Sequence, residues 1–206
     1  MKKYADAILF HTAICAGASQ IALMAEEKRK SEFLFARRLR SGMEIKMAKQ
    51  EEKTNVMRVL DSKKIPYKHY CYVDSDAVNG MEVAAVLNQN PDQVFKTLVT
   101  TGKTGAHYVF VIPVNKELNL KLAAKAVGEK SIEMLKSKDL LPLTGYIHGG
   151  CSPIGMKKAF TTVVDSSVSN FETIIFSAGK IGYQVEVALS DLQKVVRLSL
   201  HEVAGI

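Results

Sequence analysis

At 206 residues, the chain is long enough to bury one well-packed core and short for two domains of ordinary size. With 47% hydrophobic and 24% charged residues, its composition is that of a globular protein and excludes a disordered or fibrous chain. The net charge of +7 divides into +4 for residues 1–46 and +3 for residues 47–206, so it permits an RNA partner without arguing for one.

Residues 1–46 are predicted to be an N-terminal extension, and residues 47–206 to be the folded domain. The extension begins with a basic, then apolar stretch that imitates a secretory signal, but Asp6 and His11 interrupt the apolar part and argue against secretion. The charged residues 26–46 could form an amphipathic helix, either as a solvated face or as a contact with RNA or a membrane.

A third hypothesis is that translation starts at Met47 and the extension is not made. The codons of Met43 and Glu44 would contain the purine run GGA just upstream of Met47, where a bacterial ribosome-binding site belongs. The run from Met47 also resembles an ordinary cytoplasmic N-terminus that leads into a first helix.

From Met47 onward, helices and strands are predicted in mixed order. The first half should contain a helix around 56–60, a strand at 67–73, a helix at 81–87, and a hairpin of strands 94–101 and 106–113. The second half should contain a helix over 118–126 ended by Gly128, a helix at 132–135 capped by Ser131, strands at 160–165, 172–177 and 183–189, and a closing helix with a capping box of Ser190 and Gln193. Because strands and helices do not alternate regularly, an α+β domain on a mixed, curved sheet is favoured over a doubly wound fold.

The cysteines and the apolar runs give further limits. Cys15, Cys71 and Cys151 are far apart, form no CxxC pair and accompany no His cluster at metal-ligand spacing. No stretch is long and apolar enough to cross a bilayer, so no membrane partner is expected. The sequence predicts a cytoplasmic protein without a metal or a cofactor.

Two features could carry chemistry. The segment TGYIHGGCSPIG, residues 144–155, is a glycine-rich loop that could present backbone N–H groups to a ligand, although, taken alone, its glycines are better explained by a tight turn. His148 and Cys151 in this loop suggest a thiol hydrolase, but a buried cysteine is more often a packing residue. Lys96 lies inside the apolar run VFKTLV, where a strand lysine ordinarily points to solvent.

Several segments together resemble the YbaK/EbsC family of aminoacyl-tRNA deacylases, which also occurs as the editing domain of bacterial prolyl-tRNA synthetases. The matching segments run from about Val56 to the C-terminus and include KIPYKHYCY, PDQVFKTLV, LNLKLAAKAVG, LTGYIHGGCSPIGMKKAF and ETIIFSAGKIGYQVEVALSDL. The pair FKTL and TGYxxGGxSPxG is similar to the stand-alone deacylase that acts on Cys-tRNA(Pro).

The resemblance implies a mixed β-barrel of six or seven strands flanked by helices, and a substrate pocket. Lys96 would be the catalytic cation. The substrate-binding residues would be Tyr72, Phe95, Thr97, Gly149, Gly150, Ser152, Pro153 and Asp191. Cys151 and His148 match no motif position and receive no role.

The implied function is hydrolysis of the ester in mischarged Cys-tRNA(Pro), through attack of the substrate's own thiol. The implied partner is the acceptor end of tRNA(Pro), with prolyl-tRNA synthetase as a second candidate; the oligomeric state stays open. Two alternatives are a deacylase of another mischarged tRNA such as Ala-tRNA(Pro), and a non-catalytic domain that binds RNA or a synthetase.

Overall fold

The computed structural model describes residues 53–205, which form one compact unit. The predictions for the extension, residues 1–46, and the start at Met47 lie outside the described residues. Within 53–205, no helix has the length and apolar character needed to cross a bilayer.

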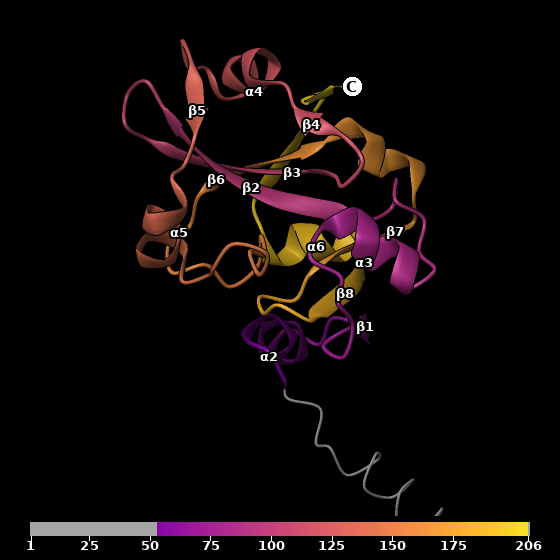
Figure 1. Cartoon of the computed structure of the whole chain (residues 1–206). Helices are drawn as coiled ribbons and strands as arrows, with labels where there is room; N and C mark the ends of the chain where they lie inside the picture. The colour runs from indigo at the N-terminus through magenta and orange to yellow at the C-terminus, as the bar shows by residue number, and fades with distance from the viewer. Residues whose placement is uncertain (1–52, 206) are drawn as a thin grey trace, which may run out of the picture. The chain divides into compact units, whose positions relative to one another are not determined.

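Helices and strands alternate irregularly along the described chain (Figure 1). The first half contains α2 (Asn55–Ser62), β1 (Lys68–Cys71), α3 (Gly80–Val86), β2 (Phe95–Gly102), β3 (His107–Pro113), β4 (Glu117–Leu118) and α4 (Leu120–Val127). The second half contains β5 (Ile132–Met134), α5 (Ser137–Thr144), β6 (Thr161–Asp165), the 3-10 helix η1 (Ser166–Asn170), β7 (Thr173–Ser177), β8 (Tyr183–Ala188), α6 (Leu189–Val195), β9 (Leu198–His201) and β10 (Ala204–Gly205).

The strands form three sheets, so the α+β class is confirmed. A five-stranded sheet has the order β5-β2-β3-β6-β9, a three-stranded sheet the order β1-β8-β7, and β4 pairs with β10. The large sheet is mixed, because β2 and β3 form an antiparallel hairpin whereas β6 runs parallel to both β3 and β9. A single bridge between Val94 and Ile175 links the two larger sheets.

The predicted single barrel of six or seven strands is not present among residues 53–205. Ten strands are divided over three sheets, and none of the ladders closes into a ring.

Side chains from both larger sheets form the main hydrophobic cluster. Phe95, Val99, Val109 and Val111 from the β2–β3 hairpin meet Val185 and Val187 of β8 and Leu192 of α6 in this cluster. A second cluster lies on the other face of the hairpin, where Phe110 and Ile112 pack against Ala123 and Ala124 of α4. The five-stranded sheet is therefore covered on both faces, with α4 on one side and α6 with the smaller sheet on the other (Figure 1).

Local capping signals explain the helix ends that the sequence predicts well. The side chain of Asn79 caps α3 by accepting hydrogen bonds from the N–H groups of Met81 and Glu82. The Glu82 side chain accepts one from the Asn79 N–H in return, so the two residues form a capping box. Gly128 ends α4 in the left-handed conformation, with φ +73°.

Several predicted elements in the second half were wrong. Residues 132–134 form β5, which pairs antiparallel with β2, and not a helix capped by Ser131. Helix α5 was not predicted, and Pro142 lies within it. The predicted capping box of Ser190 and Gln193 is absent, because α6 begins earlier, after Ala188, without a side-chain cap. Helix α6 is also not the last element, since β9 and β10 follow it.

Candidate active site

Lys96 lies near the start of β2, and its ammonium group has a partner. The side chain is 27% exposed, and Nζ lies 2.8 Å from Oε1 of Glu117 on β4. Because side chains alternate along a strand, Lys96 points to the opposite face of the sheet from Phe95 and Thr97. Lys96 is therefore a half-covered cation and not a fully solvated strand lysine.

The two neighbours of Lys96 point into the main cluster. Phe95 is 2% exposed and packs in the core. The hydroxyl Oγ1 of Thr97 is buried and has no hydrogen-bond partner among residues 53–205. Both groups therefore lie inside the protein, and the contact of Phe95 and Thr97 with substrate stays a prediction.

The glycine-rich loop begins where α5 ends and packs on the turn between β7 and β8. Gly145 and Gly149 adopt left-handed conformations, with φ +84° and +78°. A Cβ at Gly150 would lie only 3.2 Å from the backbone nitrogen of Ile181, so the two backbones approach closely there. Glycine at this position is explained by that contact.

Ser152 and Pro153 lie inside the same loop and are shielded from solvent. Ser152 is fully buried, and its hydroxyl accepts a hydrogen bond from the Ile154 N–H at 3.4 Å. Pro153 is buried as well. The loop encloses both residues, and their contact with substrate stays a prediction.

Tyr72 follows β1 and lies beside the same turn. Its N–H donates a 2.8 Å hydrogen bond to the carbonyl of Gly182, and burial raises the pKa of its half-buried phenol. The turn at 179–182 therefore contacts both Tyr72 and the loop residues Gly149 and Gly150, which brings these predicted residues into one region.

Asp191 lies in the first turn of α6 and has a local partner. Its carboxylate accepts a 2.6 Å hydrogen bond from Nζ of Lys194, one helical turn later. This i,i+3 pair gives the Asp191 carboxylate a partner within its own helix. A role for Asp191 in a substrate pocket stays a prediction.

The thiol of Cys151 is unsuited to nucleophilic attack. Cys151 is 7% exposed, and burial raises the pKa of its thiol to about 12, so the thiolate is scarce at neutral pH. His148 is exposed in the same loop. Among residues 53–205, no three His, Cys, Asp or Glu side chains are grouped so that they could hold a metal ion.

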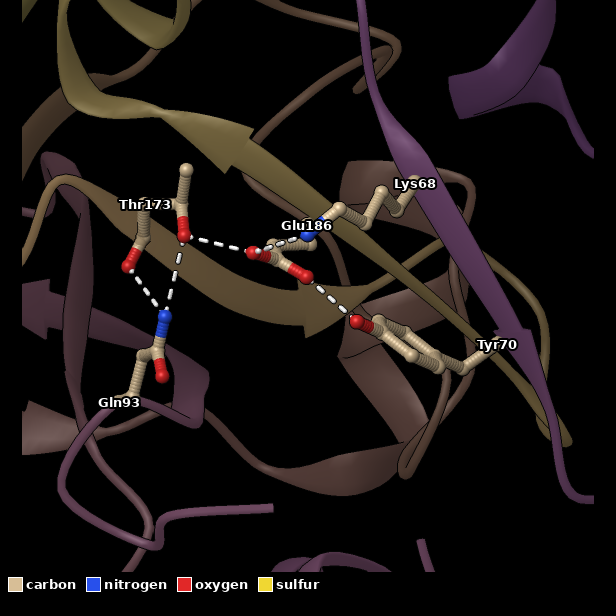
Figure 2. A network of polar contacts seen from close by, with 5 residues as sticks. All are labelled: Lys68, Tyr70, Gln93, Thr173 and Glu186. Atoms are coloured by element: carbon tan, nitrogen blue, oxygen red, sulfur yellow. Dashed lines mark hydrogen bonds and ion pairs between the residues drawn. The ribbon is translucent and has the colours of Figure 1, made fainter.

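A network of mostly part-buried polar groups joins β1, β7, β8 and the segment before β2 (Figure 2). The carboxylate of Glu186, on β8, accepts hydrogen bonds from the hydroxyls of Tyr70 and Thr173 and an ion pair from Lys68. Nε2 of Gln93 donates to the carbonyl and hydroxyl oxygens of Thr173, at 2.9 and 3.0 Å. The network thus ties the segment before β2 to β7, β8 and β1.

The ionisation of this network follows from its contacts. Burial opposes the charge of Glu186, but hydrogen bonds from Tyr70 and Thr173 and the charge of Lys68 hold the pKa of the carboxyl below its ordinary value. In turn, the hydrogen bond to Glu186 and partial burial raise the pKa of Tyr70 to about 12. At neutral pH the Glu186 carboxyl is therefore ionised and the Tyr70 phenol is neutral.

Comparison with known families adds to this geometry. The model of the aminoacyl-tRNA editing domain matches residues 75–195, which include Lys96, the glycine-rich loop and Asp191. The chain belongs to the aminoacyl-tRNA editing domain family.

Two curated proteins are similar to this editing domain, over segments of different length. A protein of Enterococcus faecalis named "Putative Cys-tRNA(Pro)/Cys-tRNA(Cys) deacylase EbsC" is 49% identical over 141 residues, which cover 68% of this chain and 86% of the relative. A proline–tRNA ligase of Pelobacter propionicus is 27% identical over 99 residues, which cover 48% of this chain and only 17% of the ligase.

Solved structures share the fold of this editing domain. One, described as a "putative trans-editing enzyme for prolyl tRNA synthetase", aligns with TM-score 0.64 and 17% identity over 74% of this chain and 96% of its own. A hypothetical protein aligns with TM-score 0.67 and 20% identity over 73% of this chain and 99% of its own. At such identities the likeness concerns the fold alone.

Two hollows in the surface of the editing domain lie away from the predicted site. One of about 510 Å³ is lined by residues of β5 and α5 together with Thr101, His107 and Lys158. The other, of about 380 Å³, lies beside α4. Neither is lined by Lys96, Tyr72 or the glycines of the loop.

Sequence reasoning missed two acidic residues, the partner of Lys96 and the carboxylate at the centre of the polar network. Glu117 gives no sequence signal, because nothing in its segment shows that it meets Lys96. Glu186 does give one, since an acidic residue inside the apolar strand run YQVEVAL must either face solvent or find buried partners.

Proposed function

We propose that this chain is a trans-editing hydrolase that deacylates mischarged Cys-tRNA(Pro) by cleaving the aminoacyl ester. The observation that carries the proposal is the 49% identity, over most of both chains, to a relative named as a deacylase of cysteinyl-tRNA. The substrate would be the acceptor end of tRNA(Pro), the place of action the cytoplasm, and prolyl-tRNA synthetase the enzyme whose errors are removed.

The need for such an enzyme follows from binding energetics. Cysteine and proline are similar in size, and a synthetase pocket gains only about 1–3 kcal/mol of discrimination from a methylene-sized difference. A second site that hydrolyses the wrong product corrects the remaining errors.

The proposed reaction uses the thiol of the substrate's cysteine as the nucleophile. Its sulfur attacks the ester carbonyl, a carbon–sulfur bond forms, and the bond between the carbonyl carbon and the ribose oxygen breaks. The thiol proton ends on the ribose hydroxyl, and water later opens the cyclic thiolactone. The buried, protonated thiol of Cys151 fits this assignment, because the protein then needs no cysteine nucleophile of its own.

Lys96 is assigned the stabilisation of charge in this reaction. When the sulfur attacks, negative charge develops on the carbonyl oxygen, and a fixed cation in a partly dry site stabilises that charge. The side chain of Lys96 is 27% exposed, so its ammonium group is partly shielded from water. Tyr72 and the backbone of Gly149 and Gly150, which meet at the turn 179–182, would hold the terminal nucleotide.

A panel of charged tRNAs tests the function. Purified protein should release cysteine from Cys-tRNA(Pro) much faster than it releases proline from Pro-tRNA(Pro), with Ala-tRNA(Pro) and Cys-tRNA(Cys) as the discriminating substrates. Preference for alanine would move the activity to a different mischarged tRNA. Release from none of the four would leave a binding domain and overturn the proposal.

Substitution of Lys96 tests its role. Lys96→Ala should lower the single-turnover rate by about 10²-fold, as does the loss of one well-placed donor in other hydrolases. Lys96→Arg keeps the charge but not the compact ammonium, and it should also lose most of the rate. Lys103→Ala, at an exposed position after β2, is the matched control. Near-normal deacylation by a folded Lys96→Ala protein would refute the assignment.

A further inference from the structure

Glu117 is an exposed carboxylate that lies against the candidate catalytic cation. Its side chain is 82% exposed, yet its Oε1 lies 2.8 Å from Nζ of Lys96, whose side chain is 27% exposed. An ion pair with one exposed member contributes little to folding stability. Stability therefore does not explain why a carboxylate should lie at this place.

The backbone around Glu117 is held by the C-terminal end of the chain. Strand β4 is only two residues long, and it pairs antiparallel with β10, so that Gly205 lies opposite Glu117. Directly after β4, the N–H of Asn119 donates a 2.8 Å hydrogen bond to the carbonyl of Val203. The position of Glu117 thus depends on residues 203–205.

A buried carboxylate holds that C-terminal segment in turn. Oδ2 of Asp165, at the end of β6, accepts hydrogen bonds from the N–H groups of Val203 at 2.9 Å and Ala204 at 2.8 Å. Asp165 is 3% exposed and Val203 is fully buried. A chain of hydrogen bonds, first from the Asp165 side chain and then along the backbone, therefore leads from the core of the five-stranded sheet to Glu117.

We propose that Glu117 is a positioning residue that holds the ammonium group of Lys96 in place for the reaction. This inference rests on the proposed deacylase function. In the free enzyme Glu117 is the counter-ion of Lys96, and it keeps the long, flexible lysine side chain in one position. Because the ammonium group of Lys96 has three N–H donors, the developing oxyanion of the substrate can accept one of them while Glu117 keeps another, without a change in the fold.

A double-mutant cycle separates this role from a structural one. Glu117→Gln should lower kcat for Cys-tRNA(Pro) about tenfold, the order expected when a reacting group is misplaced, and leave KM nearly unchanged. In a Lys96→Met background, the same substitution should have no further effect, because Glu117 acts only through Lys96. Glu133→Gln, an equally conservative change at an exposed position on β5, should leave kcat unchanged.

The kinetic outcomes decide the inference while the proposed function stands. A wild-type kcat in Glu117→Gln would overturn it. The inference would also be overturned if Glu117→Gln lowered kcat by the same factor in the wild-type and Lys96→Met backgrounds, because Glu117 would then act independently of Lys96.

A measurement that does not need deacylation tests the contact itself. Glu117 occupies one side of the Lys96 amine, so Glu117→Gln should raise the rate at which an amine-acylating reagent labels Lys96 several-fold, relative to Lys103 in the same molecule. Mass spectrometry of peptides gives both rates. If wild-type protein deacylates none of the tRNAs, the proposed function fails, and the labelling rates still report on the contact. Unchanged labelling of Lys96 overturns the positioning role whatever the activity.

Discussion

Replacement of Glu186 by glutamine should destabilise the fold because the variant removes the charged acceptor of the buried network. Glu186 is 9% exposed and accepts hydrogen bonds from the hydroxyls of Tyr70 and Thr173, the latter at 2.7 Å. A hydrogen bond to a charged group contributes about 1.5–3 kcal/mol. The amide of Gln keeps one acceptor oxygen, so the loss should correspond to about one such bond.

The ion pair of Glu186 with Lys68 adds little to this value. Nζ of Lys68 lies 3.4 Å away and its side chain is 73% exposed, so solvent screens the charge. We therefore expect Glu186→Gln to lower the free energy of unfolding by about 2 kcal/mol at neutral pH. For a domain of this size, such a loss should lower Tm by about 4–8 °C.

The effect should depend on pH in a defined direction. Because the folded-state pKa of Glu186 lies below its ordinary value of 4.5, the ionised carboxylate stabilises the fold above that pH, and the stabilisation is lost as the pH falls below it. Glutamine does not titrate. The difference in free energy of unfolding between wild type and Glu186→Gln should therefore shrink between neutral pH and about pH 3.

Urea unfolding, followed by circular dichroism at several pH values, measures both quantities. Glu133→Gln is the control, because it makes the same chemical change at an exposed position on β5 and should alter stability by no more than about 0.5 kcal/mol. A loss in Glu186→Gln as small as that of the control, or a difference that does not vary with pH, would refute the account of the network.

Two predictions concern the glycine-rich loop. Cys151→Ser should keep most deacylation, since the attacking thiol belongs to the substrate; a folded variant without activity in the charged-tRNA assay would restore Cys151 as the nucleophile. Thr144→Val should lower the free energy of unfolding by about 1–3 kcal/mol, because the Thr144 hydroxyl accepts a 3.0 Å hydrogen bond from the Tyr146 N–H and the valine would leave that buried donor unpaired. Urea unfolding of Thr144→Val measures this loss, and a stability equal to wild type would contradict it.

Sequence signals predicted those elements that local interactions determine. The hairpin of β2 and β3 was expected, as were the strands β7 and β8, and each pair joins strands that are neighbours in sequence. The start of α3 and the end of α4 carry capping residues within one turn of the helix. In these cases the residues that decide the structure lie within the same short segment.

The elements that were missed depend on distant partners. Residues 132–134 carry no strong strand pattern, and they are extended because their backbone pairs with β2, some thirty residues earlier in the chain. Strand β9 is likewise fixed by its parallel pairing with β6. The same reason applies at the site: Lys96 was expected from its motif, whereas its partner Glu117 follows only from the way in which β10 holds β4.

The pairing of β1 with β8 has a consequence for synthesis of the protein on the ribosome. Lys68 lies opposite Glu186 and Cys71 opposite Tyr183, so one of the first strands of the described chain has its only ladder with one of the last. Residues near Tyr72 can therefore reach their final positions only after the segment 183–188 has left the ribosome. Until then, β1 and the core face of β2 and β3 lack the strands and the helix that cover them, and such exposed edges and apolar surfaces favour aggregation. Nascent chains stalled before residue 183 should thus bind chaperones, and the editing domain should gain its fold only after residues 183–188 have emerged from the ribosome.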